Sequence, residues 1–208
     1  MSGAPASAKP VLVILAAGAS RRLGTCKALC ELAPGVTPLS HLLAAGRAFD
    51  NVAPVVVTGA DHVSIAATLA DGPGSSAARI IENADWAAGR SGSVRAAARA
   101  LAGRDLCLAP VDVPLVPPEV FEALVEAWLA AASPARGWLG PRHGEHYGHP
   151  LIVGRELAGE LEKMSPDRPL RDLRAQADPL LSVDVDSPEI LTDLDTPDDL
   201  FEIRKRLG

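Results

Sequence analysis

Short runs of β-branched and aliphatic residues alternate along this chain with longer Ala- and Leu-rich stretches of helical period. The apolar runs lie at Val11–Ala17, Pro54–Thr58, Arg79–Glu82 and Leu106–Val111. The helical stretches lie at Leu39–Phe49, His62–Ala70, Ser93–Leu101 and Pro118–Ala131. Strands that are apolar on both faces and separated by helices are typical of a parallel sheet covered on both sides. The pattern predicts an α/β fold, a three-layer α/β/α sandwich with a mostly parallel sheet.

The pattern is less regular in the last third of the chain. Short strands are predicted at Gly137–Leu139 and Leu151–Val153, on either side of a loop from Gly140 to Pro150. The later elements are predicted helices near Gly154–Lys163 and Pro169–Ala177, a strand at Leu181–Val185 and a closing helix from Thr196 to Leu207. Residues 1–9 are small and polar and are predicted to form a flexible tail. Since no linker or repeat interrupts the rest, residues 10–208 are predicted to form one domain.

Composition narrows the function classes. Hydrophobic residues are 48% of the 208, enough for a core, which excludes a mainly disordered chain. The net charge of −6 provides no basic face for nucleic acid or an anionic membrane. A small anionic ligand held by a few local cations is compatible with this charge.

The cysteines and the N-terminal region indicate a cytoplasmic protein. Cys26, Cys30 and Cys107 are too few for a disulfide framework, so a reducing compartment fits. The run Val11–Ala17 loosely imitates a signal peptide, but it is short and Arg21-Arg22 follow it, so a buried first strand is the favoured explanation. No stretch is long enough to span a membrane.

The connection after the first strand has the composition of an anion-binding loop. Gly18 and Gly24 allow tight turns that present backbone N–H groups, and Arg22 and Lys27 add positive charge. The spacing matches neither the P-loop nor the dinucleotide fingerprint, which also disfavours a nicotinamide-dependent oxidoreductase. On chemistry alone, a solvated glycine-rich turn remains an alternative.

The string Leu15-Ala-Ala-Gly-x-Ser-x-Arg-Leu-Gly-x-x-Lys27 resembles the signature of the MobA-like nucleotidyltransferases, with Leu23 where Met is usual. It is most similar to the molybdenum cofactor cytidylyltransferase branch. The resemblance implies a Rossmann-like nucleotidyltransferase fold and a loop that wraps the triphosphate of an NTP. Ala17 stands where the guanylyl-transferring branch has Gly, which favours CTP over GTP. The implied nucleotide-binding residues here are Leu15, Ala16, Ala17, Gly18, Ser20, Arg22, Gly24 and Lys27.

A second segment, from Asn83 to Val94, leads into a predicted helix. Ser91 or Ser93 is by itself most simply a helix N-cap. Asn-x-x-Trp followed by Gly and a Ser-rich helix start nevertheless recurs in the family that the chain resembles. By that likeness Gly89, Ser91 and Ser93 bind nucleotide, with Ser93 contacting the base.

Carboxylates follow two predicted strands. Asp112 ends the run at Leu106–Val111, where an Asp is usually a cap or turn former. The resemblance instead makes it the Asp of the family's Asp-x-Pro metal site. Asp193 or Asp195, in a C-terminal Asp-x-Asp-Thr-Pro signature, would be the second Mg²⁺ ligand, while Asp198 and Asp199 belong to the helix start.

The loop from Gly140 to Pro150 carries His143, His146 and His149. Three His in a Gly- and Pro-containing loop are a weak zinc signal, since such a loop does not fix ligand geometry. Gly148-His149-Pro150 instead resembles the Gly-His-Pro that borders the acceptor pocket of these transferases.

Taken together, the resemblance implies transfer of CMP from CTP to the terminal phosphate of molybdenum-carrying molybdopterin, with release of pyrophosphate. Arg22, Lys27 and Asp112 are the implied catalytic residues. A molybdoenzyme or its chaperone is the implied partner that receives the product. The alternatives are GTP as donor, another phosphorylated small molecule as acceptor, or a nucleotide- or cofactor-binding protein without turnover.

Overall fold

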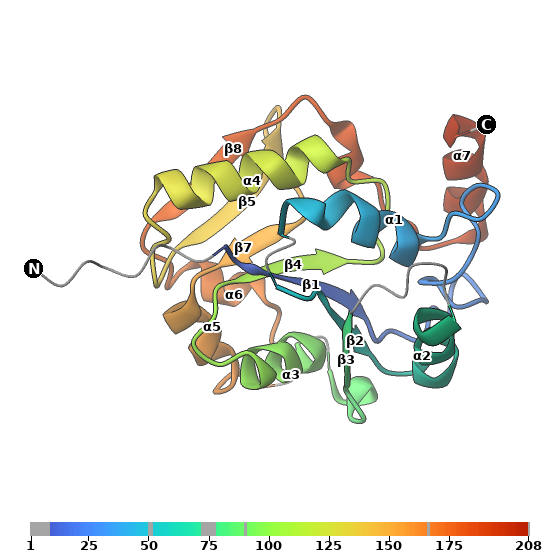
Figure 1. Cartoon of the computed structure of the whole chain (residues 1–208), viewed down its shortest axis with the longest axis horizontal. Helices are drawn as coiled ribbons and strands as arrows, with labels where there is room; N and C mark the ends of the chain where they lie inside the picture. Colours follow the sequence, from blue (N-terminus) through green and yellow to red (C-terminus); the bar gives the residue numbers. More distant parts are fainter. Residues whose placement is uncertain (1–8, 50–51, 72–77, 90, 166, 208) are drawn as a thin grey trace, which may run out of the picture.

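A computed structural model describes residues 9–49, 52–71, 78–89, 91–165 and 167–207, and it shows a sheet with helices on both faces (Figure 1). The strands are β1 (Val11–Ala16), β2 (Val55–Thr58), β3 (Arg79–Glu82), β4 (Leu106–Pro110), β5 (Trp138–His143), β6 (His146–Tyr147), β7 (Leu151–Val153) and β8 (Leu180–Asp184). The α-helices are α1 (Pro38–Ala45), α2 (His62–Asp71), α3 (Gly92–Ala100), α4 (Pro118–Ala130), α5 (Arg155–Leu161), α6 (Arg171–Arg174) and α7 (Pro197–Leu207). The 3₁₀ helices are η1 (Gly46–Phe49), η2 (Trp86–Ala88) and η3 (Pro188–Leu191).

The sheet has the order β3-β2-β1-β4-β7-β5-β6, with β8 paired to β5. Strands β1 to β4 are parallel, and Leu15 of β1 pairs with Pro110 of β4. Strand β7 is antiparallel to both β4 and β5, and β8 is parallel to β5. The carboxyl ends of β1, β2 and β4 therefore meet at one edge, where open α/β sheets bind their ligands.

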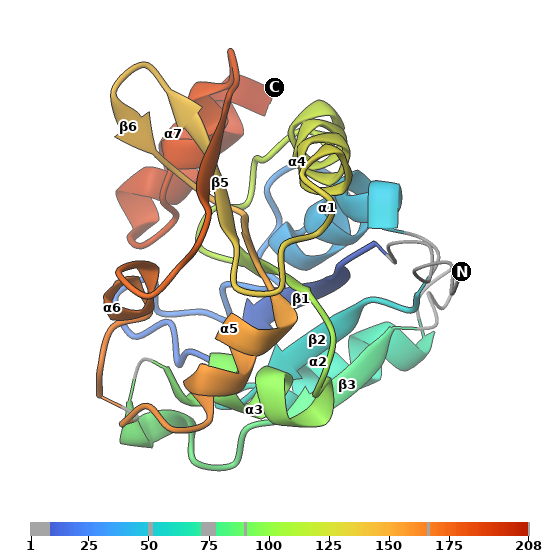
Figure 2. The same cartoon turned by 90° about the vertical axis from the view of Figure 1, so that its left-hand side faces the viewer.

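Alternate residues of β1 face opposite layers. Leu12 and Ile14 pack in one apolar cluster with residues of α1 and α4, whereas Val11 and Val13 pack in another with residues of α3 and α5. Figure 2 shows these helix pairs on the two sides of the sheet. Because successive side chains of a strand point to opposite faces, a strand buried on both sides is apolar throughout. The predicted three-layer α/β fold with a mostly parallel sheet is confirmed.

The segment from Gly140 to Pro150, predicted as a loop, is mainly a β-hairpin, and that prediction is wrong. Strand β5 continues to His143, which pairs with His146 of β6 across a turn where Gly144 has φ +57°. Pairing with β7 and β8 supports β5 although Pro141 interrupts its apolar pattern. Sequence periodicity could not detect a strand that depends on its neighbours in this way.

Smaller differences concern helix lengths. The helix predicted to run from Leu39 to Phe49 ends at Ala45, and Gly46 begins η1, where an added Cβ would lie 2.3 Å from Leu12 Cδ2. The helical segment predicted over residues 169–177 is helical only in α6.

No described helix has the length and apolarity needed to cross a membrane. Residues 1–8 of the expected tail lie outside the described residues, and the one-domain assignment stays a prediction.

The buried carboxylate of Asp105, directly before β4, is hydrogen-bonded to α4 and α5, and we expect its removal to destabilise the protein. Its carboxylate accepts hydrogen bonds from the Trp128 indole N–H (3.0 Å) and the Arg155 backbone N–H (2.8 Å). In Asp105→Ala both donors lose their partner inside the protein, so we expect the free energy of unfolding to fall by about 2–4 kcal/mol. Urea titration measures this loss. Glu126→Ala, on the exposed face of α4, should change it by less than about 0.5 kcal/mol.

Candidate active site

The candidate site lies at the sheet edge where β1 and β4 end. A cavity of about 270 Å³ there is lined by Leu15, Ala17, Gly18, Ser20, Lys27, Ser93, Pro110, Val111 and Asp112. A second cavity of about 470 Å³ is lined by Ala17, Gly18, Ala19, Ser20, Arg21, Trp86, Ala87, Gly89 and Ser93. The two cavities share four lining residues, so together they form one cleft with two compartments.

Ser20 holds the loop after β1 in shape. Its carbonyl accepts hydrogen bonds from the N–H groups of Leu23 (3.1 Å) and Gly24 (3.0 Å), and its hydroxyl accepts one from the Lys27 N–H (3.1 Å). Gly24 has φ +77°, a left-handed conformation that favours glycine. These contacts bring Lys27 back toward the start of the loop, beside the cleft.

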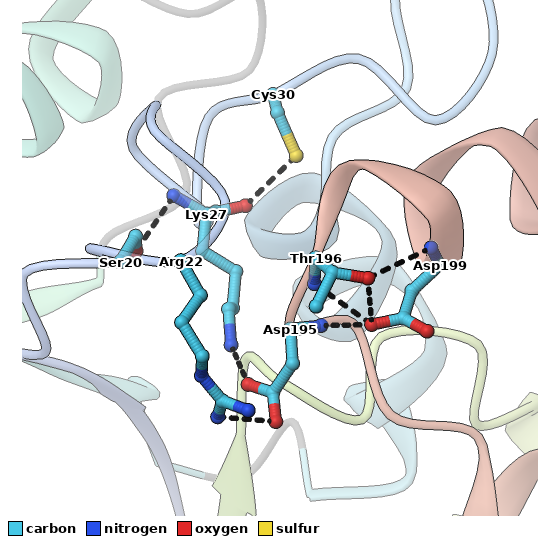
Figure 3. A network of polar contacts seen from close by, with 7 residues as sticks. All are labelled: Ser20, Arg22, Lys27, Cys30, Asp195, Thr196 and Asp199. Atoms are coloured by element: carbon cyan, nitrogen blue, oxygen red, sulfur yellow. Dashed lines mark hydrogen bonds and ion pairs between the residues drawn. The ribbon is translucent and has the colours of Figure 1, made fainter.

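Two cations from this loop converge on Asp195, as Figure 3 shows. Lys27 Nζ lies 2.8 Å from Asp195 Oδ1, and an Arg22 terminal guanidinium nitrogen lies 2.7 Å from Asp195 Oδ2. The hydrogen bond from Lys27, together with the charges of both cations, lowers the pKa of Asp195 below its usual value. Lys27 is only 11% exposed, whereas Arg22 is 71% exposed, so the lysine ammonium is held in the more protected position.

Asp195 is itself anchored by the start of α7. Its backbone N–H donates to Asp199 Oδ2 (2.9 Å), which also accepts from the Thr196 N–H (2.7 Å) and hydroxyl (2.9 Å). The same bonds lower the pKa of Asp199. Asp199 thus has the structural role predicted for it, and it fixes the backbone from which the Asp195 carboxylate reaches the loop (Figure 3).

Asp112 and Asp193 lie close enough to influence each other. The Leu194 N–H donates to the Asp112 carbonyl (2.7 Å), which joins the C-terminal segment to the end of β4. Burial, followed by the negative charges of Asp112 and Asp195, raises the pKa of Asp193. His149 lies near Asp112 and Asp193, and burial lowers its pKa in spite of these carboxylates.

These two carboxylates fit a divalent cation that is completed by substrate. Magnesium usually takes one or two protein carboxylates together with phosphate oxygens and water. Across the described ranges, no group of three or more His, Cys, Asp and Glu side chains could hold a metal ion. A cation held by Asp112 and Asp193 would reduce their mutual repulsion, which adds to the effect of burial in raising the pKa of Asp193. Asp195 is the weaker candidate, because Lys27 and Arg22 already engage both its oxygens.

Ser93, the residue predicted to contact the base, lines the larger compartment. The buried Asn83 donates from Nδ2 to the hydroxyl oxygen of Ser93 (3.2 Å), which orients Ser93 in the cleft wall. Ser91, by contrast, donates its hydroxyl to the backbone carbonyl of Arg168 and is absent from both linings. Arg90, which also belongs to the segment from Asn83 to Val94, lies outside the described residues.

Two of the predicted acceptor residues, Gly148 and His149, join β5 to η3. The Gly148 N–H donates to the Pro141 carbonyl (3.0 Å) and the His149 N–H to the Ile190 carbonyl (3.1 Å). A Cβ on Gly148 would lie 2.4 Å from the Ile190 oxygen, so this close approach requires glycine. The buried His149 Nδ1 makes no hydrogen bond within the described structure and is left for another group.

The structure gathers many, but not all, of the predicted residues around the cleft. Ala16, Arg22, Gly24, Ser91, Asp193, Asp195, Gly148, His149 and Pro150 do not line either compartment. Ala16 instead packs in the apolar cluster under α1 and α4. Sequence reasoning did not assign Arg21, Asn83 or Trp86 to the site, although Asn83 and Trp86 both belong to the Asn-x-x-Trp string. No sequence signal marked Arg21.

Comparison with known proteins identifies the family of this chain. Residues 12–180 match the family model of the MobA-like NTP transferase domain. The molybdenum cofactor cytidylyltransferase of Escherichia coli is 26% identical over 194 residues, which cover 93% of this chain and 95% of that protein.

Similar solved structures extend over nearly the whole chain. Rv0371c from Mycobacterium tuberculosis has a TM-score of 0.75 at 25% identity, over 94% of this chain and 98% of that one. A structure of Rv0371c in complex with manganese has a TM-score of 0.69 at 24% identity, over 95% and 98%. A nucleotidyl transferase from Methanothermobacter thermautotrophicus has a TM-score of 0.77 at 21% identity, over 95% and 97%. The last two are similar to this chain in fold.

Proposed function

Since this chain is a nucleotidyltransferase of the MobA-like NTP transferase family, we propose that it transfers CMP from CTP to molybdopterin carrying molybdenum. The acceptor group is the terminal phosphate of the pterin, and pyrophosphate is the second product. The observation that carries the proposal is the cavity of about 270 Å³, whose wall contains both Lys27 and Asp112. A phosphate-binding cation and a metal-binding carboxylate at one cavity suit phosphoryl chemistry.

The residues of the chain act by position and charge. A phosphate oxygen of the acceptor attacks the α-phosphorus in line with the departing pyrophosphate, so no covalent enzyme intermediate is needed. Lys27 and Arg22 hold the β- and γ-phosphates and stabilise the negative charge that develops there. Gly148, His149 and Pro150 border the acceptor, and the free Nδ1 of His149 suits a polar group of that substrate.

Asp112 and Asp193 are the residues that would hold the divalent cation, for which we propose Mg²⁺. Bound magnesium supplies charge neutralisation on phosphate oxygens. The manganese complex of Rv0371c, a protein of similar fold, supports a divalent metal. Both carboxylates come from segments that the Leu194–Asp112 backbone bond joins, so the chain presents them together.

The choice of CTP rests on Ala17 and on the similarity to the Escherichia coli cytidylyltransferase. Ala17 is 5% exposed and lines both compartments. Its methyl group packs tightly beside Gly59, where an added Cβ would lie 2.8 Å from that of Ala17. Since Ala17 lines both compartments, we infer that its side chain narrows the cleft and favours a pyrimidine over the larger purine.

Ala17→Gly tests this account of donor choice. Removing one methyl group from the wall should raise the ratio of kcat/KM for GTP to that for CTP by about tenfold, because one methylene in a pocket contributes about 1–3 kcal/mol to selectivity. Ala102→Gly is the matched control, since Ala102 is an exposed turn residue that lines neither compartment. An unchanged ratio in Ala17→Gly would contradict the steric explanation.

The whole proposal is tested by pyrophosphate release from CTP, GTP, ATP and UTP with molybdenum-carrying molybdopterin as acceptor. Release from CTP alone is the expected result. Release from GTP would indicate that the protein is a guanylyltransferase. Release only with another phosphorylated acceptor would indicate that molybdopterin is not its substrate. Binding of CTP without turnover would instead indicate a nucleotide-binding protein.

The cellular setting follows from the same proposal. We infer that the product passes to a molybdoenzyme or its chaperone in the cytoplasm. The free thiols of Cys26, Cys30 and Cys107 suit a reducing compartment.

A further inference from the structure

The two cations assigned to the triphosphate are already paired with an internal anion. Asp195 binds Lys27 with one carboxylate oxygen and Arg22 with the other, at 2.8 and 2.7 Å (Figure 3). The pairs join positions 168 and 173 residues apart. A two-oxygen anion that bridges two cations is also how a phosphate group would engage them.

The position of Asp195 is set independently of these cations. Its backbone is tied to Asp199, and Thr196 reinforces that bond at the start of α7. The carboxylate therefore lies at the end of a fixed segment, while Lys27 and Arg22 belong to a loop beside the cleft. Lys27 also lines the cavity of about 270 Å³, so the residue that binds the internal carboxylate also borders the space for phosphate.

We propose that Asp195 is a positioning residue that stands in for phosphate on Lys27 and Arg22, and that it competes with pyrophosphate for these cations. This inference rests on the proposed function, in which pyrophosphate is a product. Two cations and one carboxylate give the cluster a net charge of +1 rather than +2. The attraction for an anion is therefore weaker than the cations alone would provide.

The consequence for the reaction is faster product release. When the bond between the α- and β-phosphates breaks, pyrophosphate takes the bonding electron pair and remains on Lys27 and Arg22. Asp195 then replaces it on the cations, so that they do not have to become unpaired as the product leaves. The protected Lys27 gains most from this exchange, because an unpaired ammonium at 11% exposure is costly.

Competition and metal ligation predict opposite changes in pyrophosphate affinity when the Asp195 carboxylate is removed. They also differ in whether the change requires a metal ion. A metal ligand contributes only when the cation is present, and its loss weakens binding. A competing carboxylate acts without metal, and its loss strengthens binding. Inorganic pyrophosphate separates the two, since its binding depends on neither the donor base nor the acceptor.

The experiment measures the Kd of inorganic pyrophosphate by calorimetry, in EDTA and in Mg²⁺, for the wild type and Asp195→Asn. Asparagine keeps an oxygen that accepts from Lys27 but removes the charge. We expect pyrophosphate to bind about fivefold more tightly to Asp195→Asn in EDTA, the size of a partly exposed ion-pair effect. The gain should shrink as salt rises from about 0.05 M to about 0.5 M, because the charges are then screened. Product inhibition by pyrophosphate should strengthen in parallel.

Two further variants show that the effect acts through this cluster. Asp198→Asn removes the same charge from an exposed residue in the first turn of α7 and should leave the Kd unchanged. In an Arg22→Ala background the gain from Asp195→Asn should be smaller, since one of the two competed cations is missing.

Other results would overturn the proposal. Weaker pyrophosphate binding by Asp195→Asn in EDTA would show that the carboxylate assists anion binding. A change seen only with Mg²⁺ would make Asp195 a metal ligand, and equal Kd values throughout would show that it does not act on the cations. A wild type that binds pyrophosphate but does not use CTP would contradict the proposed donor and leave this test intact.

Discussion

Asp112→Asn is expected to lower kcat by roughly 10²–10³-fold, because a divalent cation contributes several kcal/mol of charge stabilisation in the transition state. Asparagine keeps the shape of the side chain but removes the charge that Mg²⁺ requires. The Asp112 carbonyl still accepts from the Leu194 N–H, so the fold around the site should persist. Steady-state kinetics across a magnesium titration measure the effect, which high Mg²⁺ should partly restore.

The control for this variant is Asp186→Asn, an exposed carboxylate in the same C-terminal region. It should retain wild-type kcat and the same requirement for Mg²⁺. Near-normal turnover by Asp112→Asn would show that Asp112 does not hold the metal. A large fall in thermal stability would instead assign it a structural role.

Lys27→Ala is expected to lower kcat/KM for CTP by roughly tenfold to a hundredfold. A hydrogen bond to a charged group contributes about 1.5–3 kcal/mol, and this lysine is the protected cation of the loop. Arg22 remains paired with Asp195 in the variant, so the loop keeps one contact with the C-terminal segment. Kinetics with CTP and the stabilisation of the protein by CTP in a thermal melt both measure the loss.

Two further substitutions serve as controls for Lys27→Ala. Lys163→Ala removes an exposed lysine paired with Glu160 and should leave both measurements unchanged. Lys27→Arg keeps the charge but not the compact ammonium, so it should bind CTP better than Lys27→Ala. Undiminished stabilisation by CTP in Lys27→Ala would exclude this lysine from the phosphate site.

The central strands of the fold could be predicted from the local pattern of apolar residues. Runs such as Val11–Ala16 are apolar at every position, and only a strand covered on both faces needs that composition. The hairpin of β5 and β6 could not be predicted from the sequence, because Pro141 and the charged Arg142 beside it interrupt the alternation of apolar and polar residues. Pairing with β7 and β8 decides that segment.

The candidate site likewise has features that the sequence predicted and features that it did not. Glycines and cations that lie within one loop are local, so the sequence alone indicated an anion-binding loop with Gly18, Gly24, Arg22 and Lys27. It also placed carboxylates at Asp112 and in the segment from Asp193 to Asp199, but it could not choose between Asp193 and Asp195 for the metal.

That choice depends on contacts between segments far apart in the chain. Only the folded chain places Asp195 against Lys27 and Arg22, brings Asp193 near Asp112, and turns the Ser91 hydroxyl toward Arg168. The sequence by itself determined the four parallel strands β1 to β4, the loop chemistry and the available carboxylates, because each follows from neighbouring residues. The tertiary structure decided which charged side chains form pairs, because an electrostatic interaction depends on the distance between the groups in the folded chain.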